Sequence, residues 1–211
     1  MKKLKEIYAR LFKHYGPQHW WPAKTKFEVI VGAILVQNTN WGNVEKALNN
    51  LKANKILSPD ALRTIIPSKL ASLIQPAGYF NVKTKRLKNF ITFFFDEYDG
   101  SMKNMKKESL AVLRPKLLSI NGIGLETADS ILLYAFDKPI FVVDAYTKRL
   151  LSRHGIITLD TDYHAIQNIF MECFTHDAKM FNEYHALIVQ VGKDYCKPKP
   201  RCEQCLLRSL L

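Results

Sequence analysis

Two glycines that lie two positions apart, Gly122 and Gly124, mark the first stretch of the chain that could bind a phosphate. They separate an apolar helical stretch from a new helix that we expect to begin near Glu126. Glycine lets the backbone turn tightly there, and the free N–H groups at the start of the next helix would point at an anion. Such a turn grips a nucleic-acid backbone without reading its sequence. An ordinary turn between two helices has the same pattern, so these glycines alone leave both interpretations open.

A single carboxylate, Asp144, occupies the second position of chemical interest. It follows the apolar run Phe141 to Val143 and precedes a polar stretch, from Ala145, that we expect to be helical. The dipole and the free N–H groups of a helix start favour the charged form of such a carboxylate. It is therefore available to stabilise a cation or to take up a proton, although most aspartates in this position are simple helix caps.

The three tryptophans of the chain gather in two short segments. Trp20 and Trp21, followed by Pro22, precede the first core helix, whereas Trp41 follows the end of that helix, with Gln37 close by. A base turned out of a duplex needs flat faces to stack on, and an electron-deficient base gains cation–π attraction from indoles. Packing in the protein interior explains Trp20 or Trp21 equally well when either is taken alone.

Three cysteines, Cys196, Cys202 and Cys205, crowd into a short segment near the end of the sequence. This spacing fits metal binding in a reducing compartment better than a disulfide framework. We therefore treat these three thiols as candidate metal ligands. Cys173 is a fourth candidate only if the fold brings it near them, and a buried structural cysteine explains it better.

Basic side chains are spread along the whole chain, which has 31 Lys and Arg against 19 Asp and Glu and a formal net charge of +12. Nucleic acid is the acidic polymer that such a balance favours as a partner. Lys197 and Lys199, on a proline-spaced loop, are candidates for phosphate contact. A second basic run, from Lys83 to Lys88, is either a DNA-facing edge or the solvated face of its helix.

Helical periodicity dominates the sequence and predicts an all-α fold. The first core helix has apolar residues on one face, and Thr25 with Glu28 is placed as a capping box at its start. Ser58 before Pro59 predicts another helix start. Further apolar stripes at helical spacing cover residues 87–94, 110–118, 131–134 and 181–191. We find no convincing pair of strands.

The length of 211 residues allows one large helical core or two small lobes. No flexible linker divides the chain, and the segment 137–143, which lacks helical periodicity, is the best candidate for a crossing between lobes. The sequence shows no signal segment and no apolar run of membrane-spanning length, so we expect a cytosolic protein without a membrane partner.

The hairpin glycines, the apolar crossing and Asp144 together resemble the helix-hairpin-helix glycosylases related to endonuclease III, over residues 27–205. The resemblance implies two helical lobes around a DNA-binding cleft. One is a six-helix barrel with the hairpin, over 24–136, and the other combines 1–23 with 137–211 and includes the cysteine loop. It also implies that Asp144 is the catalytic residue and that the partner is duplex DNA with a damaged base, bound by a monomer.

Bifunctional members of this family have a lysine nucleophile two residues after the second hairpin glycine, where this chain has Glu126. Without an amine that attacks C1′, no Schiff base forms and strand cleavage by β-elimination loses its route. The resemblance therefore implies a monofunctional glycosylase, which leaves an abasic site. In such an enzyme Asp144 stabilises the oxocarbenium-like sugar and aligns or activates water.

The Trp-Trp-Pro segment and the Gln-Asn-Thr helix end are similar to those of the 3-methyladenine glycosylase branch. By this resemblance Trp21 and Trp41 stack on the two faces of the base. Trp20 could take the role of Trp21. Gln37 would fill the gap left in the duplex. An alkylated purine is already a good leaving group, so a pocket with stacking surface and little acid equipment suffices.

Family members with a four-iron, four-sulfur cluster have a fourth cysteine about five residues after the third, where this chain ends its tail with Leu211. A 4Fe-4S cluster could therefore be held by three thiolates and a substitute ligand, or it has been lost. Zinc with an outside ligand, such as a histidine, is a third interpretation.

The sequence is also compatible with two other functions. The first is a bifunctional endonuclease III type enzyme that acts on oxidised pyrimidines with a lysine placed elsewhere, and Glu126 argues against it. The second is a non-catalytic helix-hairpin-helix module that only binds DNA, and Asp144 argues against that. Pockets for alkylated purines and for mismatched thymine share aromatic walls, so the sequence does not select between these lesions.

Overall fold

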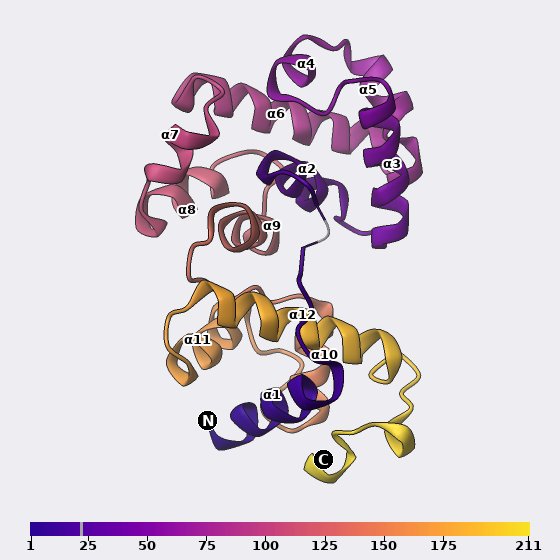
Figure 1. Cartoon of the computed structure of the whole chain (residues 1–211), viewed down its shortest axis with the longest axis vertical. Coiled ribbons are helices and arrows are strands. Elements are labelled where there is room, and N and C mark those ends of the chain that lie inside the picture. Colours follow the sequence, from indigo (N-terminus) through magenta and orange to yellow (C-terminus); the bar gives the residue numbers. More distant parts are fainter. Residues whose placement is uncertain (22) are drawn as a thin grey trace. The chain divides into compact units, whose positions relative to one another are not determined.

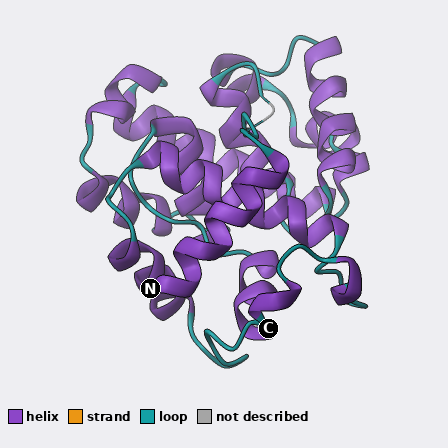
Figure 2. Ribbon diagram, turned by 60° about the horizontal axis from the view of Figure 1, so that its bottom comes forward, coloured by secondary structure: helices purple, strands orange, loops and turns teal. Residues whose placement is uncertain are grey.

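The computed structural model describes residues 1–21 and 23–211, and within them the chain forms helices joined by loops, without a strand (Figures 1 and 2). The predicted all-α fold is confirmed for these residues. The chain divides into two compact units. We call Ala23–Phe136 the inserted unit, and Met1–Pro22 with Asp137–Leu211 the terminal unit. Among the described residues, none of the helices has the length and apolar character needed to cross a bilayer.

The inserted unit is built around α2 (Lys26–Leu35), which packs against α3, α6, α9 and the π-helical turn Ile131–Ala135. The sequence predicted one apolar face for α2, whereas the structure buries every residue from Phe27 to Leu35. The other helices of this unit are α3 (Trp41–Ala53), α4 (Pro59–Thr64), α5 (Pro67–Leu73), α6 (Phe80–Tyr98), α7 (Met102–Lys107), α8 (Leu110–Leu118) and α9 (Leu125–Ser130).

Side-chain caps start two of these helices where the sequence predicts them. The Thr25 hydroxyl accepts a hydrogen bond of 3.1 Å from the backbone N–H of Glu28, at the start of α2. The Glu28 carboxylate accepts from the N–H of Lys24, one residue before the position that a capping box would use. Ser58 caps α4 in the predicted way, with Pro59 in the first turn.

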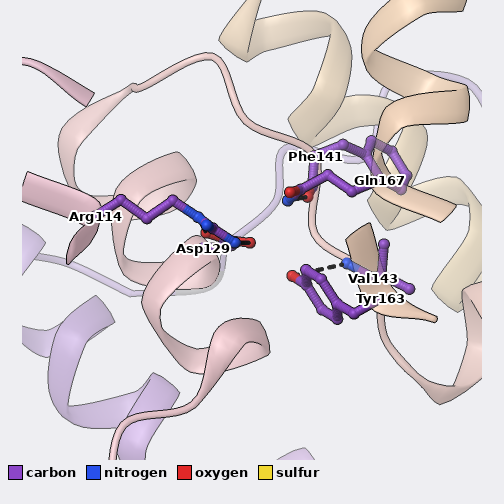
Figure 3. Close-up of polar contacts among 6 residues, drawn as sticks. All are labelled: Arg114, Asp129, Phe141, Val143, Tyr163 and Gln167. Carbon is purple, nitrogen blue, oxygen red and sulfur yellow. Dashed lines mark hydrogen bonds and ion pairs between the residues drawn. The ribbon is translucent and has the colours of Figure 1, made fainter. Parts of the chain in front are cut away.

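A buried ion pair ties together the two helices that flank the hairpin glycines. Arg114 of α8 donates two hydrogen bonds, of 2.7 and 3.1 Å, to the two carboxylate oxygens of Asp129 in α9. The Asp129 side chain is fully buried, and Figure 3 shows the two side chains end to end. Paired, planar hydrogen bonds of this kind fix orientation as well as distance, so α8 and α9 hold the turn between them in one geometry.

The terminal unit contains α1 (Lys2–Tyr15), α10 (Ala145–Arg153), α11 (Tyr163–Cys173) and α12 (Ala178–Asp194). Two tyrosine hydroxyls join α1 to α12. Tyr184 donates to the Leu4 carbonyl at 2.8 Å, and Tyr15 donates to Asp194 at 2.9 Å. The rings of Phe141 and Phe170 stack in the core of this unit, with centroids 3.6 Å apart.

Candidate active site

Asp144 ends an extended segment and caps α10, the helix that the sequence predicts from Ala145. Its Oδ1 accepts a hydrogen bond of 2.7 Å from the backbone N–H of Thr147. The side chain keeps 13% of its surface exposed. The cap therefore uses one carboxylate oxygen, and the catalytic role that the resemblance assigns to Asp144 stays a prediction.

The extended segment before Asp144 is held in place by two side chains of α11. Gln167 donates a hydrogen bond of 2.6 Å to the Phe141 carbonyl, and the Tyr163 hydroxyl accepts one of 3.4 Å from the Val143 N–H. Figure 3 shows both side chains directed at this backbone. Because these groups satisfy a segment that has no helix or sheet of its own, they fix the point from which Asp144 projects.

His185 of α12 approaches the second carboxylate oxygen of Asp144, with 3.5 Å between Nε2 and Oδ2. Burial by itself would raise the pKa of the Asp144 carboxyl. The charge of His185 and the hydrogen bond from Thr147 outweigh burial, so the pKa lies below its usual value. Sequence reasoning missed His185. Its one signal is a polar residue inside the buried stripe of α12 that contains Tyr184 and Leu187.

The hairpin glycines differ in what their backbones require. Gly122 has a φ of 97°, in the region that favours glycine, and a Cβ added there would lie 2.3 Å from Cγ of Arg86. Gly124 is extended, caps α9 and has no atom within 4 Å of an added Cβ. A pocket of about 560 Å³ in the inserted unit is lined by this turn together with Gln37 and Arg86.

Gln37 is bonded to the hairpin through its side-chain amide. Its side-chain N–H group donates to the Gly122 carbonyl at 3.0 Å and to the Thr127 hydroxyl at 2.8 Å. Its carbonyl oxygen accepts a hydrogen bond from Arg86. These bonds show Gln37 supporting the turn, whereas its predicted role in filling a gap in the duplex stays a prediction.

The basic run at the start of α6 serves mainly to bind other parts of the inserted unit. Lys83 is 1% exposed and donates to the Ala77 carbonyl at 2.7 Å, and burial, with the charge of Arg86, lowers its pKa to about 8. Lys88 donates to the carbonyls of Leu62 and Arg63 in α4 and to that of Ile65, which follows the helix. Lys85 is exposed. The expectation of a DNA-facing edge or a solvated face is therefore wrong for Lys83, because its ammonium is buried and bonded to the Ala77 carbonyl.

The predicted base-pocket residues fall in different units. Trp20 and Trp21, in the terminal unit, are half-buried and meet edge to face, with ring centroids 5.8 Å apart, and Lys193 lies over the Trp20 ring. Trp41 is the first residue of α3 in the inserted unit and is also half-buried. Pro22, the third member of the Trp-Trp-Pro segment, lies outside the described residues. A shared role of these indoles in base binding stays a prediction.

The three cysteines of the terminal unit, Cys196, Cys202 and Cys205, are half-buried free thiols that line one cavity together with Leu207 and Leu211. Leucine has no atom that could bind iron or zinc, so this donor set lacks the fourth ligand. Among the described residues, no group of three or more His, Cys, Asp or Glu side chains is arranged to hold a metal ion. The residues present therefore do not fit a complete cluster.

Two arginines of α10 hold the loop that begins at Cys196. Arg149 donates to the Cys196 carbonyl at 2.5 Å. Arg153 donates to the Cys196 sulfur at 3.3 Å and to the Lys197 carbonyl at 2.7 Å. Lys197 is half-buried and Lys199 is exposed, so the Lys199 ammonium is the more accessible of the two for a phosphate.

Glu126 lies in the first turn of α9 and is exposed. It takes the position at which the resemblance would place a lysine nucleophile. A carboxylate near the start of a helix is favoured by the helix dipole. It cannot form a Schiff base with a sugar, so this position supplies no amine for strand cleavage.

Comparisons with known proteins identify the relatives of this chain. Residues 31–176 match the model of the HhH-GPD superfamily of base excision DNA repair proteins. A Methanocaldococcus jannaschii protein, provisionally named a DNA repair glycosylase, is 49% identical over 206 residues, which cover 97% of this chain and 93% of the relative. The structure of the H. pylori 3-methyladenine DNA glycosylase MagIII, solved with 1,N6-ethenoadenine, matches with a TM-score of 0.78 at 32% identity. The match covers 91% of this chain and 97% of the MagIII chain. The structure of a trapped endonuclease III–DNA covalent intermediate matches with a TM-score of 0.85 at 19% identity, over 99% of this chain and 94% of the endonuclease III chain. At this identity the match establishes a shared fold and nothing further.

Proposed function

Because this chain belongs to the HhH-GPD superfamily of base excision DNA repair proteins, we propose that it hydrolyses the N-glycosidic bond of an alkylated purine, such as 3-methyladenine, and leaves the DNA strand intact. Its relatives show that the chain is a DNA repair glycosylase with DNA as its partner. The proposal adds the substrate class and the monofunctional reaction. The observation that supports it best is the lowered pKa of the Asp144 carboxyl, together with a carboxylate, Glu126, at the position where the resemblance would place a lysine.

The proposed reaction needs few groups from the protein. The bond between C1′ and the base nitrogen breaks, and the electron pair leaves with the base, which alkylation has already made cationic. Asp144 stabilises the positive charge that develops on the sugar and orients a water molecule whose oxygen bonds to C1′. The water proton is released, and the products are a free base and an abasic site.

The name and ligand of the H. pylori relative support an alkylated or etheno purine as the substrate. The indoles of Trp20, Trp21 and Trp41, each half-buried, are the flat faces that we propose for stacking on such a base. A cationic purine gains about 1 to 2 kcal/mol from each desolvated face. Neutral oxidised pyrimidines gain less, so they are expected to be poorer substrates.

Duplexes with single defined lesions test the proposal. We expect release of 3-methyladenine, whose alkylated base is cationic, slower release of 1,N6-ethenoadenine, which is neutral, and strand breaks only after heating in alkali. Borohydride added during the reaction should trap no covalent protein–DNA adduct, because no amine forms a Schiff base. A strong trapped band with an oxidised pyrimidine duplex would restore the bifunctional reaction, and binding without release from every duplex would restore the non-catalytic module.

We propose in addition that the C-terminal loop keeps its conformation without a four-iron cluster. Arg149 and Arg153 bind its carbonyls and the Cys196 sulfur, and Leu211 lines the same cavity as the three thiols, at the position where the resemblance would place the fourth cysteine. Anaerobically purified protein should contain much less than one iron and one sulfide per chain, and chelator treatment should leave its melting temperature unchanged. Four irons and four sulfides per chain would contradict this proposal.

A further inference from the structure

The buried imidazole of His185 touches the carboxylate that we assign to catalysis. Its Nε2 lies 3.5 Å from Oδ2 of Asp144, and the His185 side chain is 6% exposed. We propose that His185 is a positioning residue, which fixes the second oxygen of Asp144 so that the carboxylate meets the sugar in one orientation. This inference rests on the proposed function, because it takes Asp144 as the residue that acts on the sugar.

The two oxygens of Asp144 are held from two different helices. Oδ1 is bound to the Thr147 N–H at the start of α10, and Oδ2 faces His185 of α12. A cap bonded through one oxygen can still rotate about its last side-chain bond, whereas contacts to both oxygens fix the plane of the carboxylate. Catalysis depends steeply on such alignment, because a misplacement of about 1 Å can cost roughly a hundred-fold in rate.

Packing alone does not account for a histidine at this position. The ring of His185 lies edge to face against Phe141, with centroids 6.1 Å apart, and an apolar ring would fill the same space. Burying an imidazole costs free energy unless it has a polar partner, and here that partner is the Asp144 carboxylate. A buried imidazole next to a partly exposed carboxylate is typical of a functional site.

Among the described residues, groups of α10, α11 and α12 lie near the carboxylate or its backbone, and each has a distinct effect. Thr147 of α10 supplies an N–H, and the electrostatic interaction with His185 of α12 lowers the pKa of the Asp144 carboxyl. Tyr163 of α11 binds the neighbouring backbone at Val143 through its hydroxyl. His185 is thus the group whose removal should change the ionisation of Asp144 most, and the direction is upward.

Two variants test the proposal by kinetics. His185→Phe should lower the single-turnover rate of base release roughly ten- to a hundred-fold, with unchanged affinity for DNA. The acidic limb of its pH–rate profile should move to higher pH, because Asp144 loses a charge that favours its ionised form. His185→Gln keeps a donor and should recover part of the rate, and it serves as the second variant if His185→Phe does not fold. His176→Gln, an exposed histidine of the same unit, should change neither quantity.

An NMR titration of the Asp144 carboxyl carbon in DNA-free protein gives a readout that does not depend on activity. The ionisation midpoint should be higher in His185→Phe than in the wild-type protein. A folded variant with an unchanged midpoint and an unchanged rate would overturn the proposal. A raised midpoint together with full activity of an Asp144→Asn variant would instead overturn the catalytic assignment of Asp144 and leave the contact between the two side chains established.

Discussion

The Asp144→Asn variant should release damaged bases roughly a thousand-fold more slowly than the wild-type protein while binding damaged duplex with the same affinity. Asparagine has nearly the same shape and caps helices as well as aspartate does, so α10 should keep its start. The amide lacks the negative charge that stabilises the sugar cation. Single-turnover base release and fluorescence anisotropy with the same duplex measure the two quantities.

Asp162→Asn is the matched control for this variant. Asp162 also caps a helix of the terminal unit, α11, and its carboxylate accepts hydrogen bonds from two backbone N–H groups. If capping were the whole role of Asp144, the two variants would have equal activity. We expect Asp162→Asn to be as active as the wild-type protein, and full activity of Asp144→Asn would remove Asp144 from the reaction.

The Gly122→Ala variant should lower the free energy of unfolding by about 2 to 3 kcal/mol. Its φ of 97° is strained for alanine, and the new Cβ would collide with the aliphatic part of Arg86. If Arg86 moves, Gln37 loses a partner and the turn loses its support. Affinity for undamaged duplex should fall roughly ten-fold, as for one lost hydrogen bond to a charged group. Urea unfolding and anisotropy provide the measurements.

Gly124→Ala separates strain from contact with DNA. Its backbone is extended and an added Cβ meets no protein atom within 4 Å, so its stability should stay within about 1 kcal/mol of the wild-type value. A fall in DNA affinity without a fall in stability would show that the exposed backbone of the turn approaches a phosphate. Equal stability of the two alanine variants would contradict the strain that we assign to Gly122.

Local sequence signals predicted the starts of helices well, because a cap depends on residues three positions apart. Ser58 and Thr25 cap the helices for which they were proposed, and Asp144 begins α10 as expected. The residues that complete the site were not predictable in this way. Gln37 lies 85 positions from Gly122 and bonds to it only because α2 packs against α9.

His185 and Lys83 show that the environments of charged and polar groups were also not predictable from the sequence. Helical spacing places both residues on helix faces, but it does not reveal that one imidazole meets a carboxylate or that one ammonium meets a carbonyl. Composition counts Lys83 as a surface charge, whereas its environment is a buried one. Ionisable groups inside a protein take their roles from tertiary partners, which a single sequence does not contain.

The division of the chain has a consequence for its folding during synthesis on the ribosome. The inserted unit, Ala23–Phe136, is one continuous segment, so all its residues have emerged before α12 is translated. The terminal unit needs both of its segments, because the apolar side chains of Leu4, Ile7 and Leu11 in α1 are buried in a unit where α1 packs on α12. At typical translation rates, α12 is therefore synthesised on the order of ten seconds after α1, and the apolar surface of α1 stays exposed during that time. The helices around the hairpin can already assemble in the same interval.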